Sequence, residues 1–191
     1  MLIVCEGAKT EPFYFKFLRD KLRLASVEVN GKGGSAPISV VETAIKQKLD
    51  AEESEGQVKY DSVWCVMDVE APEPHDTLND ALIKATENGL KVALSNPCFE
   101  FWLLLHSVKT SRFFDNNKAV LRELRKHHPN YAKGDDSIFQ RIYPDTDTAI
   151  TNTESILKEK GCSENLLNCN PSTHVHRLVQ ELRRINDGSA K

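Results

Sequence analysis

The first half of the chain alternates short, continuous apolar runs with longer segments whose apolar residues recur at helical spacing. The runs predict strands at residues 2–5, 27–29, 62–67 and 91–94. The longer segments predict helices at residues 10–24, 37–53 and 78–88. A strand that is buried on both faces reads as one continuous apolar run, which is typical of a parallel sheet. The alternating order therefore predicts an α/β fold, with a mostly parallel sheet flanked by helices.

The second half reads differently, because apolar stripes at helical spacing replace the strand-like runs. They predict helices near residues 97–106, 116–127, 146–160 and 171–186, and loops at 129–136 and 143–147. No flexible linker separates the two halves. We therefore expect an α/β core over residues 1–95 and a C-terminal helical extension over residues 96–191 that packs on it.

Composition places the chain among ordinary globular proteins, with 40% hydrophobic and 28% charged residues in 191. The longest apolar run, Phe101–Leu105, is far shorter than the roughly 20 residues that cross a bilayer. The chain begins almost directly with a strand, so we expect no signal peptide and a cytoplasmic protein. Because that strand starts at residue 2, a natural start further upstream stays open.

The five cysteines form no CxxC pair, and three of them lie in or beside apolar runs. Free cysteine is among the most buried residue types, and disulfides are rare in reducing compartments. We therefore expect all five to be buried thiols in a reducing compartment, rather than disulfides or zinc ligands. The five are Cys5, Cys65, Cys98, Cys162 and Cys169.

Charge is distributed unevenly behind a formal net charge of −3. From Glu42 to Asp80 there are eleven acidic residues and three lysines. From Arg112 to Lys133 there are six basic residues and two acidic ones. An acidic face and a separate basic face suit a polyanionic substrate held near a metal ion. Each run taken alone is also compatible with a solvated helix face.

Acidic residues stand directly after three apolar runs. Glu6 follows the first, Asp68 and Glu70 follow the third, and Glu100 lies beyond the fourth. The carboxyl ends of parallel strands meet at one edge of a sheet, where ligands bind. In extended backbone Asp68 and Glu70 would point the same way, with Val69 turned back to the core. Grouped carboxylate oxygens predict a site for Mg²⁺ or Mn²⁺.

Other readings of these residues stay open. Glu6 is also compatible with a surface or helix-start position. Glu100 stands among bulky apolar residues, so it would either ligate the metal or pair with an Arg or Lys that locks its helix onto the sheet. The segment 7–10 lacks the upstream glycine of a GxxxxGK[ST] loop, which excludes a P-loop nucleotide triphosphatase.

Glu6-Gly7 after the first strand, with Asp68 and Glu70 after the third, resembles the Toprim arrangement of a Glu and a DxD pair. The segments 4–15, 95–106 and 170–173 are similar to those of RloB-like proteins. This resemblance implies a Toprim-like core, a Mg²⁺-dependent nuclease, and anti-phage defence loci that often encode an ATPase partner. Glu70 departs from the second Asp of DxD, which leaves metal number and geometry open and leaves Glu73 as a residue that could share the role.

We therefore expect a Mg²⁺- or Mn²⁺-dependent nuclease acting on DNA or RNA. Glu6, Asp68, Glu70 and Glu100 are the candidate metal ligands. Glu6, Lys9 and Asp68 are the candidate catalytic residues, with Lys9 on a phosphate oxygen. The candidate nucleic-acid contacts are Lys9, Arg112, Lys118, Arg122, Arg125 and Lys126.

Four further function classes bear on this core. The chain is too short for the separate nucleophilic-tyrosine domain of a topoisomerase, and it shows no zinc-binding part of a primase. A non-catalytic subunit that binds nucleic acid or a nucleotide and works with an ATPase partner is the main alternative, and a small-molecule phosphohydrolase is another. The segment 170–173 would either cap a helix or hold a phosphate at the helix start.

Overall fold

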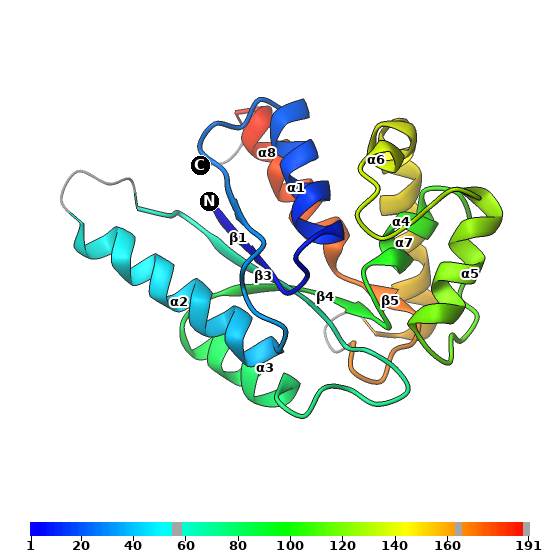
Figure 1. Ribbon diagram of the computed structural model, residues 1–191, viewed down its shortest axis with the longest axis horizontal. Helices are drawn as coiled ribbons and strands as arrows, with labels where there is room; N and C mark the ends of the chain where they lie inside the picture. The colour runs from blue at the N-terminus through cyan, green and yellow to red at the C-terminus, as the bar shows by residue number, and fades with distance from the viewer. Residues whose placement is uncertain (55–58, 163–165, 189–191) are drawn as a thin grey trace.

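The computed structural model describes residues 1–54, 59–162 and 166–188 and contains a five-stranded sheet between layers of helices (Figure 1). The strands are β1 (Leu2–Cys5), β2 (Glu28–Asn30), β3 (Val63–Asp68), β4 (Lys91–Asn96) and β5 (Ser172–Thr173). Their order across the sheet is β2-β1-β3-β4-β5. Neighbours among the first four strands pair in parallel, and β5 is antiparallel to β4. The predicted α/β fold with a mostly parallel sheet is confirmed.

Helices fill the connections and most of the second half. They are α1 (Thr10–Lys21), α2 (Pro37–Glu53), α3 (Leu78–Glu87), α4 (Glu100–Leu105), α5 (Asn117–His127), α6 (Ser137–Ile142), the short 3-10 helix η1 (Tyr143–Asp145), α7 (Thr146–Lys160) and α8 (Val175–Asn186). Within the described part of the chain, each helix is too short or too polar to reach across a membrane.

The two faces of the sheet build two separate cores. Successive side chains of a strand point to opposite faces, so β1 sends Ile3 and Cys5 to one core and Leu2 and Val4 to the other. The larger core lies under α1, α4 and α8, and the smaller lies under α2 and α3 (Figure 1). Burial on both faces explains the uninterrupted apolar runs of β1 and β3.

The second half of the chain is helical, as predicted, but it also completes the sheet. The helix expected from residue 171 begins only at Val175, because residues 172–173 pair with the edge of β4 as β5. The helix expected from residue 97 begins at Glu100. Residues 137–142 form α6, which periodicity did not predict, and the expected loop at 143–147 is η1 followed by the start of α7. Two-residue strands and one-and-a-half-turn helices are too short to show a period.

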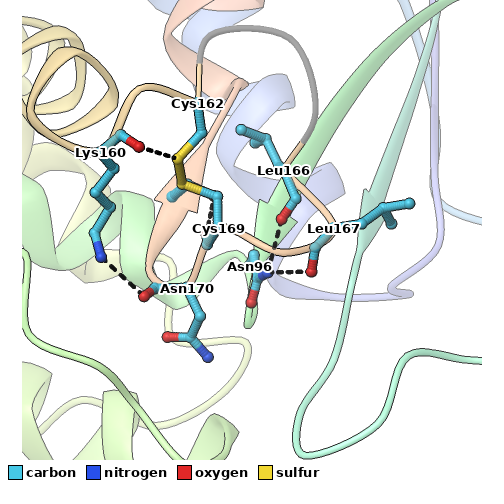
Figure 2. The surroundings of a disulfide bond; sticks show 8 residues. Asn96, Lys160, Cys162, Leu166, Leu167, Cys169 and Asn170 are labelled. Atoms are coloured by element: carbon cyan, nitrogen blue, oxygen red, sulfur yellow. Dashed lines mark hydrogen bonds between the residues drawn. A yellow bond between two sulfur atoms is a disulfide. The ribbon is translucent and has the colours of Figure 1, made fainter.

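The expectation that all five cysteines are thiols is wrong for two of them. Cys162 and Cys169 form a disulfide, with Cα atoms 6.3 Å apart (Figure 2). Cys5, Cys65 and Cys98 are free and buried. The absence of a CxxC pattern shows only that no two cysteines lie three positions apart in the sequence. It does not exclude a disulfide between cysteines that are further apart. The two cysteines stand seven positions apart, and their Cα separation lies within the range that a disulfide bridges.

Candidate functional site

A cleft of about 580 Å³ opens at the carboxyl ends of β1 and β3. Glu6 follows β1, Asp68 ends β3, and Glu70 stands two residues beyond it. Glu11 enters from the first turn of α1, and residues 31–35 of the loop after β2 close another side. The predicted convergence of Glu6, Asp68 and Glu70 at one edge of the sheet is therefore present.

Strand pairing fixes Glu6 against Asp68. Cys5 lies opposite Val66 in the parallel ladder, and the N–H of Glu6 donates to the carbonyl of Val66 at 3.0 Å. The N–H of Asp68 donates to Oε2 of Glu6 at 3.1 Å. These backbone contacts hold the two acidic residues side by side.

Their electrostatics reflect burial without enough neutralising charge. Burial raises the pKa of Glu6 to about 7, and repulsion from Glu70 and Glu11 adds to it against the hydrogen bond from Asp68. Burial also raises the pKa of Asp68 well above its ordinary range, with repulsion from Glu11, Glu100 and Glu6. A proton or a metal cation would relieve both groups.

Glu11, in the first turn of α1, is a member of this cluster that the sequence analysis did not identify. Burial raises its pKa, and repulsion from Glu100 adds to the effect. Gly7 makes room for it: a Cβ on Gly7 would lie 2.1 Å from Oε2 of Glu11. In the sequence, the position of Glu11 in the first turn of the helix that follows the Glu6-Gly7 bend could have indicated that it belongs to the site.

Glu70 reaches the cleft by a different geometry from the one predicted. Extended backbone through residue 70 would place Asp68 and Glu70 on one face, but β3 ends at Asp68 and Glu70 has φ 65°. The N–H of Glu70 donates to the carbonyl of Pro97 at 2.9 Å, which secures this turn. A non-glycine residue at positive φ is costly and occurs often at functional sites. Val69 is buried, as expected.

Glu100 lies beneath the cleft and does not line it, with 2% of its surface exposed. Nζ of Lys133 stands 3.4 Å from its Oε1, and the hydroxyl of Tyr131 donates to the same oxygen at 3.4 Å. This arrangement corresponds to the second reading of Glu100 given by the sequence, in which its carboxylate pairs with a basic residue. Glu100 still acts on the site, because its charge raises the pKa of Asp68.

Lys133 is the second residue that sequence reasoning missed as part of the site. Partial burial lowers its pKa, but attraction to Glu100, Asp68 and Glu11 outweighs that effect and raises it. Lys133 lines the cleft, whereas Lys9 is exposed at the start of α1, with its side chain against Gly134. In the sequence, Lys133 stands beside Gly134 in a predicted loop, and this position could have indicated its role in the site.

The donor set suits a hard divalent cation, because every candidate ligand is a carboxylate. The candidates that line the cleft are Glu6, Asp68 and Glu70, together with Glu11. Across residues 1–54, 59–162 and 166–188, however, no three His, Cys, Asp or Glu side chains already stand in a metal-holding arrangement. The chemistry of the site fits Mg²⁺ or Mn²⁺, and the side chains would have to turn toward the ion.

The candidate nucleic-acid contacts gather on and beside α5, whose first residue, Asn117, lines the cleft. Arg112 and Lys126 both pair with Glu123, at 2.8 and 2.7 Å. Nε of Arg125 donates to the carbonyl of Tyr131 at 3.1 Å. Lys118 and Arg122 are exposed, one turn apart, and have no ion-pair partner within the described ranges.

The segment 170–173 does not form the phosphate-binding helix start that its sequence offered as one reading. The side chain of Asn170 bonds both the N–H and the carbonyl of Phe114, at 3.1 and 2.8 Å. Oγ1 of Thr173 accepts from the N–H of Val175 at 3.2 Å, so the threonine satisfies the start of α8. Both polar side chains therefore have structural roles.

Comparison with known proteins gives one match. The family model described as RloB-like protein matches residues 1–182, nearly the whole chain. No curated protein and no solved structure matches the chain.

Proposed function

Because this chain belongs to the RloB-like family, we propose that it is a Mg²⁺- or Mn²⁺-dependent nuclease that hydrolyses phosphodiester bonds in DNA or RNA and acts in anti-phage defence. The observation that carries the proposal is the convergence of Glu6, Glu11, Asp68 and Glu70 on one cleft at the carboxyl edge of the sheet. The raised pKa values of Glu6, Glu11 and Asp68 mark a site with a deficit of positive charge.

Asp68 and Glu70 would hold the metal, with Glu6 completing the site. Bound there, the metal would orient the scissile phosphate and stabilise the charge that develops on it. Glu11 adds a carboxylate within reach of the same cleft. Glu100 would act from beneath, by fixing Lys133 at the cleft wall through their 3.4 Å ion pair.

The chain's own residues supply the remaining parts. Where it does not ligate the metal, Glu6 can take a proton from the attacking water or return one near neutral pH, since burial raises its pKa to about 7. Lys133 lines the cleft and can contact a phosphate oxygen, with Lys9 as an outer contact. Exposed Lys118 and Arg122 would bind the backbone of the nucleic acid as it leaves the cleft.

A second candidate is a non-catalytic subunit that binds nucleic acid and works with an ATPase partner. The observation that favours it is that the described carboxylates are not arranged as a ready-made metal site. Lys133 would then neutralise the cluster permanently, in place of a metal.

The test measures cleavage of single-stranded DNA, duplex DNA and transfer RNA with Mg²⁺ or Mn²⁺. Asp68→Asn should lower the rate by about 100-fold or more, because it weakens a contact worth several kcal/mol in the transition state. Asp76→Asn is the matched control, since Asp76 is exposed in the loop before α3. Equal rates for wild type and Asp68→Asn, or no metal-dependent cutting at all, would move the proposal to the non-catalytic subunit.

A further inference from the structure

We propose that a second cleft, next to the acidic one, binds one unpaired nucleobase stacked on Phe113, so that the substrate is a single-stranded segment of nucleic acid. This inference names the substrate class for the nuclease site and rests on the proposed function. It is carried by an exposed aromatic ring at the rim of a cleft that shares Glu70 with the acidic cleft.

Phe113 stands out among the large apolar side chains at the surface. It is 67% exposed, more than Ile83 at 58% or Phe13 at 37%. A single exposed apolar residue is common in proteins and needs no explanation by itself. Phe113, however, lines a cleft of about 280 Å³ that reaches the proposed metal ligand Glu70. An aromatic face there can stack with any of the four bases.

The backbone that carries Phe113 is held firmly. The side chain of Asn170 makes two hydrogen bonds to the backbone of the next residue, Phe114. Phe114 is buried, with its ring centre 6.1 Å from that of Phe101, and the guanidinium of Arg112 lies 4.7 Å from the centre of the Phe114 ring. The ring of Phe113 therefore projects from an anchored segment, which lowers the entropic cost of stacking a base on it.

The opposite wall is also anchored. The amide nitrogen of Asn96 donates to the carbonyls of Leu166 and Leu167, at 2.8 and 3.1 Å, and the Cys162–Cys169 disulfide closes the same loop (Figure 2). Leu167 and Asn168 of this loop line the cleft. Asn168 and Asp115 offer an amide and a carboxylate group to the edge of a base.

The two clefts share Glu70, and this connection determines whether a single strand or a duplex can occupy both. Neighbouring nucleotides along one strand would place a phosphate among the carboxylates and an adjacent base against Phe113. In a duplex each base is stacked and paired, so it can enter this cleft only after it leaves the helix. Single strands, loops and ends present such bases without that cost.

The probe is a fluorescein-labelled 20-nucleotide oligothymidine carrying one 2-aminopurine, compared with the same strand in a duplex. Binding by the full chain is measured by anisotropy in EDTA, and stacking is measured by 2-aminopurine quenching. Wild type should bind the single strand more tightly and quench it. Phe113→Ala should weaken single-strand binding at least about fivefold and abolish quenching, because a stacked base contributes that much or more.

Two variants separate stacking from folding. Phe113→Trp should restore quenching, and Ile83→Ala, a similarly exposed apolar residue on α3, should behave as wild type. Unchanged quenching in Phe113→Ala, or equal affinity of wild type for single strand and duplex, would overturn the inference. If that variant keeps metal-dependent cleavage, the nuclease proposal stands without it. If quenching depends on Phe113 but no cutting occurs, base binding stands and the nuclease proposal fails.

Discussion

The acidic cleft and the basic helix α5 carry opposite charge, and they differ most in how that charge is compensated. In the cleft, Glu6, Glu11 and Asp68 are partly buried, and burial and repulsion raise their pKa values although Lys32 and Lys133 also line it. At α5, Lys126 and the preceding Arg112 share Glu123 at the surface, and the lysine's hydrogen bond lowers the pKa of that carboxyl.

The difference shows where electrostatic free energy is available for binding. Charges in the cleft are costly to fold, and a cation that enters recovers this cost as affinity. Charges on α5 are solvated and screened, so they add little to stability. Under the proposed function, the acidic cleft would bind a cation specifically, and α5 would hold a nucleic-acid backbone without sequence preference.

The largest expected effect on stability is that of Glu6→Gln. The pKa of Glu6 is raised to about 7, so the folded state holds this proton more tightly than the unfolded state, and stability falls as pH rises from about 4.5 to 7. Glutamine removes the charge and can still accept from Asp68. In EDTA at pH 8 the variant should be more stable by about 2–3 kcal/mol in urea unfolding.

The pH dependence separates this effect from an ordinary surface change. At pH 4 wild-type Glu6 is itself protonated, so the gain from Glu6→Gln should vanish. Glu73→Gln, an exposed position nearby, should change stability little at either pH. A gain that is the same at both pH values would show that repulsion in the cleft is not its cause.

Removing Lys133 from the cleft should have the next largest effect. Lys133→Met leaves the buried Glu100 without a cation, with the neutral groups of Tyr131 and Cys98 as partners, which should lower stability by about 1–2 kcal/mol after allowance for the exposed lysine. Lys126→Met deletes a lysine that pairs with Glu123 at the surface, and it should cost less than about 0.5 kcal/mol. If Lys133→Met and Lys126→Met lowered the free energy of unfolding equally in chemical denaturation, the ion pairs of the cleft and of α5 would not differ in their contribution to stability.

Nucleic-acid binding should depend on α5 by a smaller, salt-sensitive amount. Changing Lys118 and Arg122 together to Gln should weaken binding of a single strand several-fold and reduce the slope of log K against log salt by about 1.4. The pair Arg112 and Lys126, already shared with Glu123, should have a smaller effect for the same change of charge. Titration at several salt concentrations measures both.

The smallest expected effect is that of Glu123→Gln. It breaks two surface ion pairs, and stability should change by less than about 0.5 kcal/mol in thermal unfolding. It also frees two cations, so binding of a single strand should become slightly tighter. A large loss of stability would mean that the α5 pairs resemble the buried pair of Glu100 and Lys133.

Sequence patterns predicted the parts of this molecule that depend on local order. β1, β3 and β4 follow from long apolar runs, and Glu6 and Asp68 from their position at the ends of two of them. Glu11 and Lys133 could not be placed in the site, because they meet Asp68 only through the packing of α1 and the loop after α5. The division at residue 95 stays a prediction.

The other differences between the sequence predictions and the structure concern short segments or single residues. β5 has two residues and no visible period, and it forms because β4 offers it an edge. Cys162 and Cys169 form a disulfide across a sequence separation of seven, which no local cysteine pattern indicates. The backbone of Glu70 turns to positive φ, where a strand-based reading assumes extension. In each case a tertiary contact outweighs the local pattern.

The late position of β5 in the sequence also affects the nascent chain while it is made on the ribosome. Until residues 172–173 emerge, the edge of β4 has no partner, and an unpaired edge is a template for pairing with other chains. The edge of β4 therefore stays uncovered while residues 97–171 are made. Stop codons or ribosomal pauses before residue 172 should yield chains that depend on chaperones to remain apart.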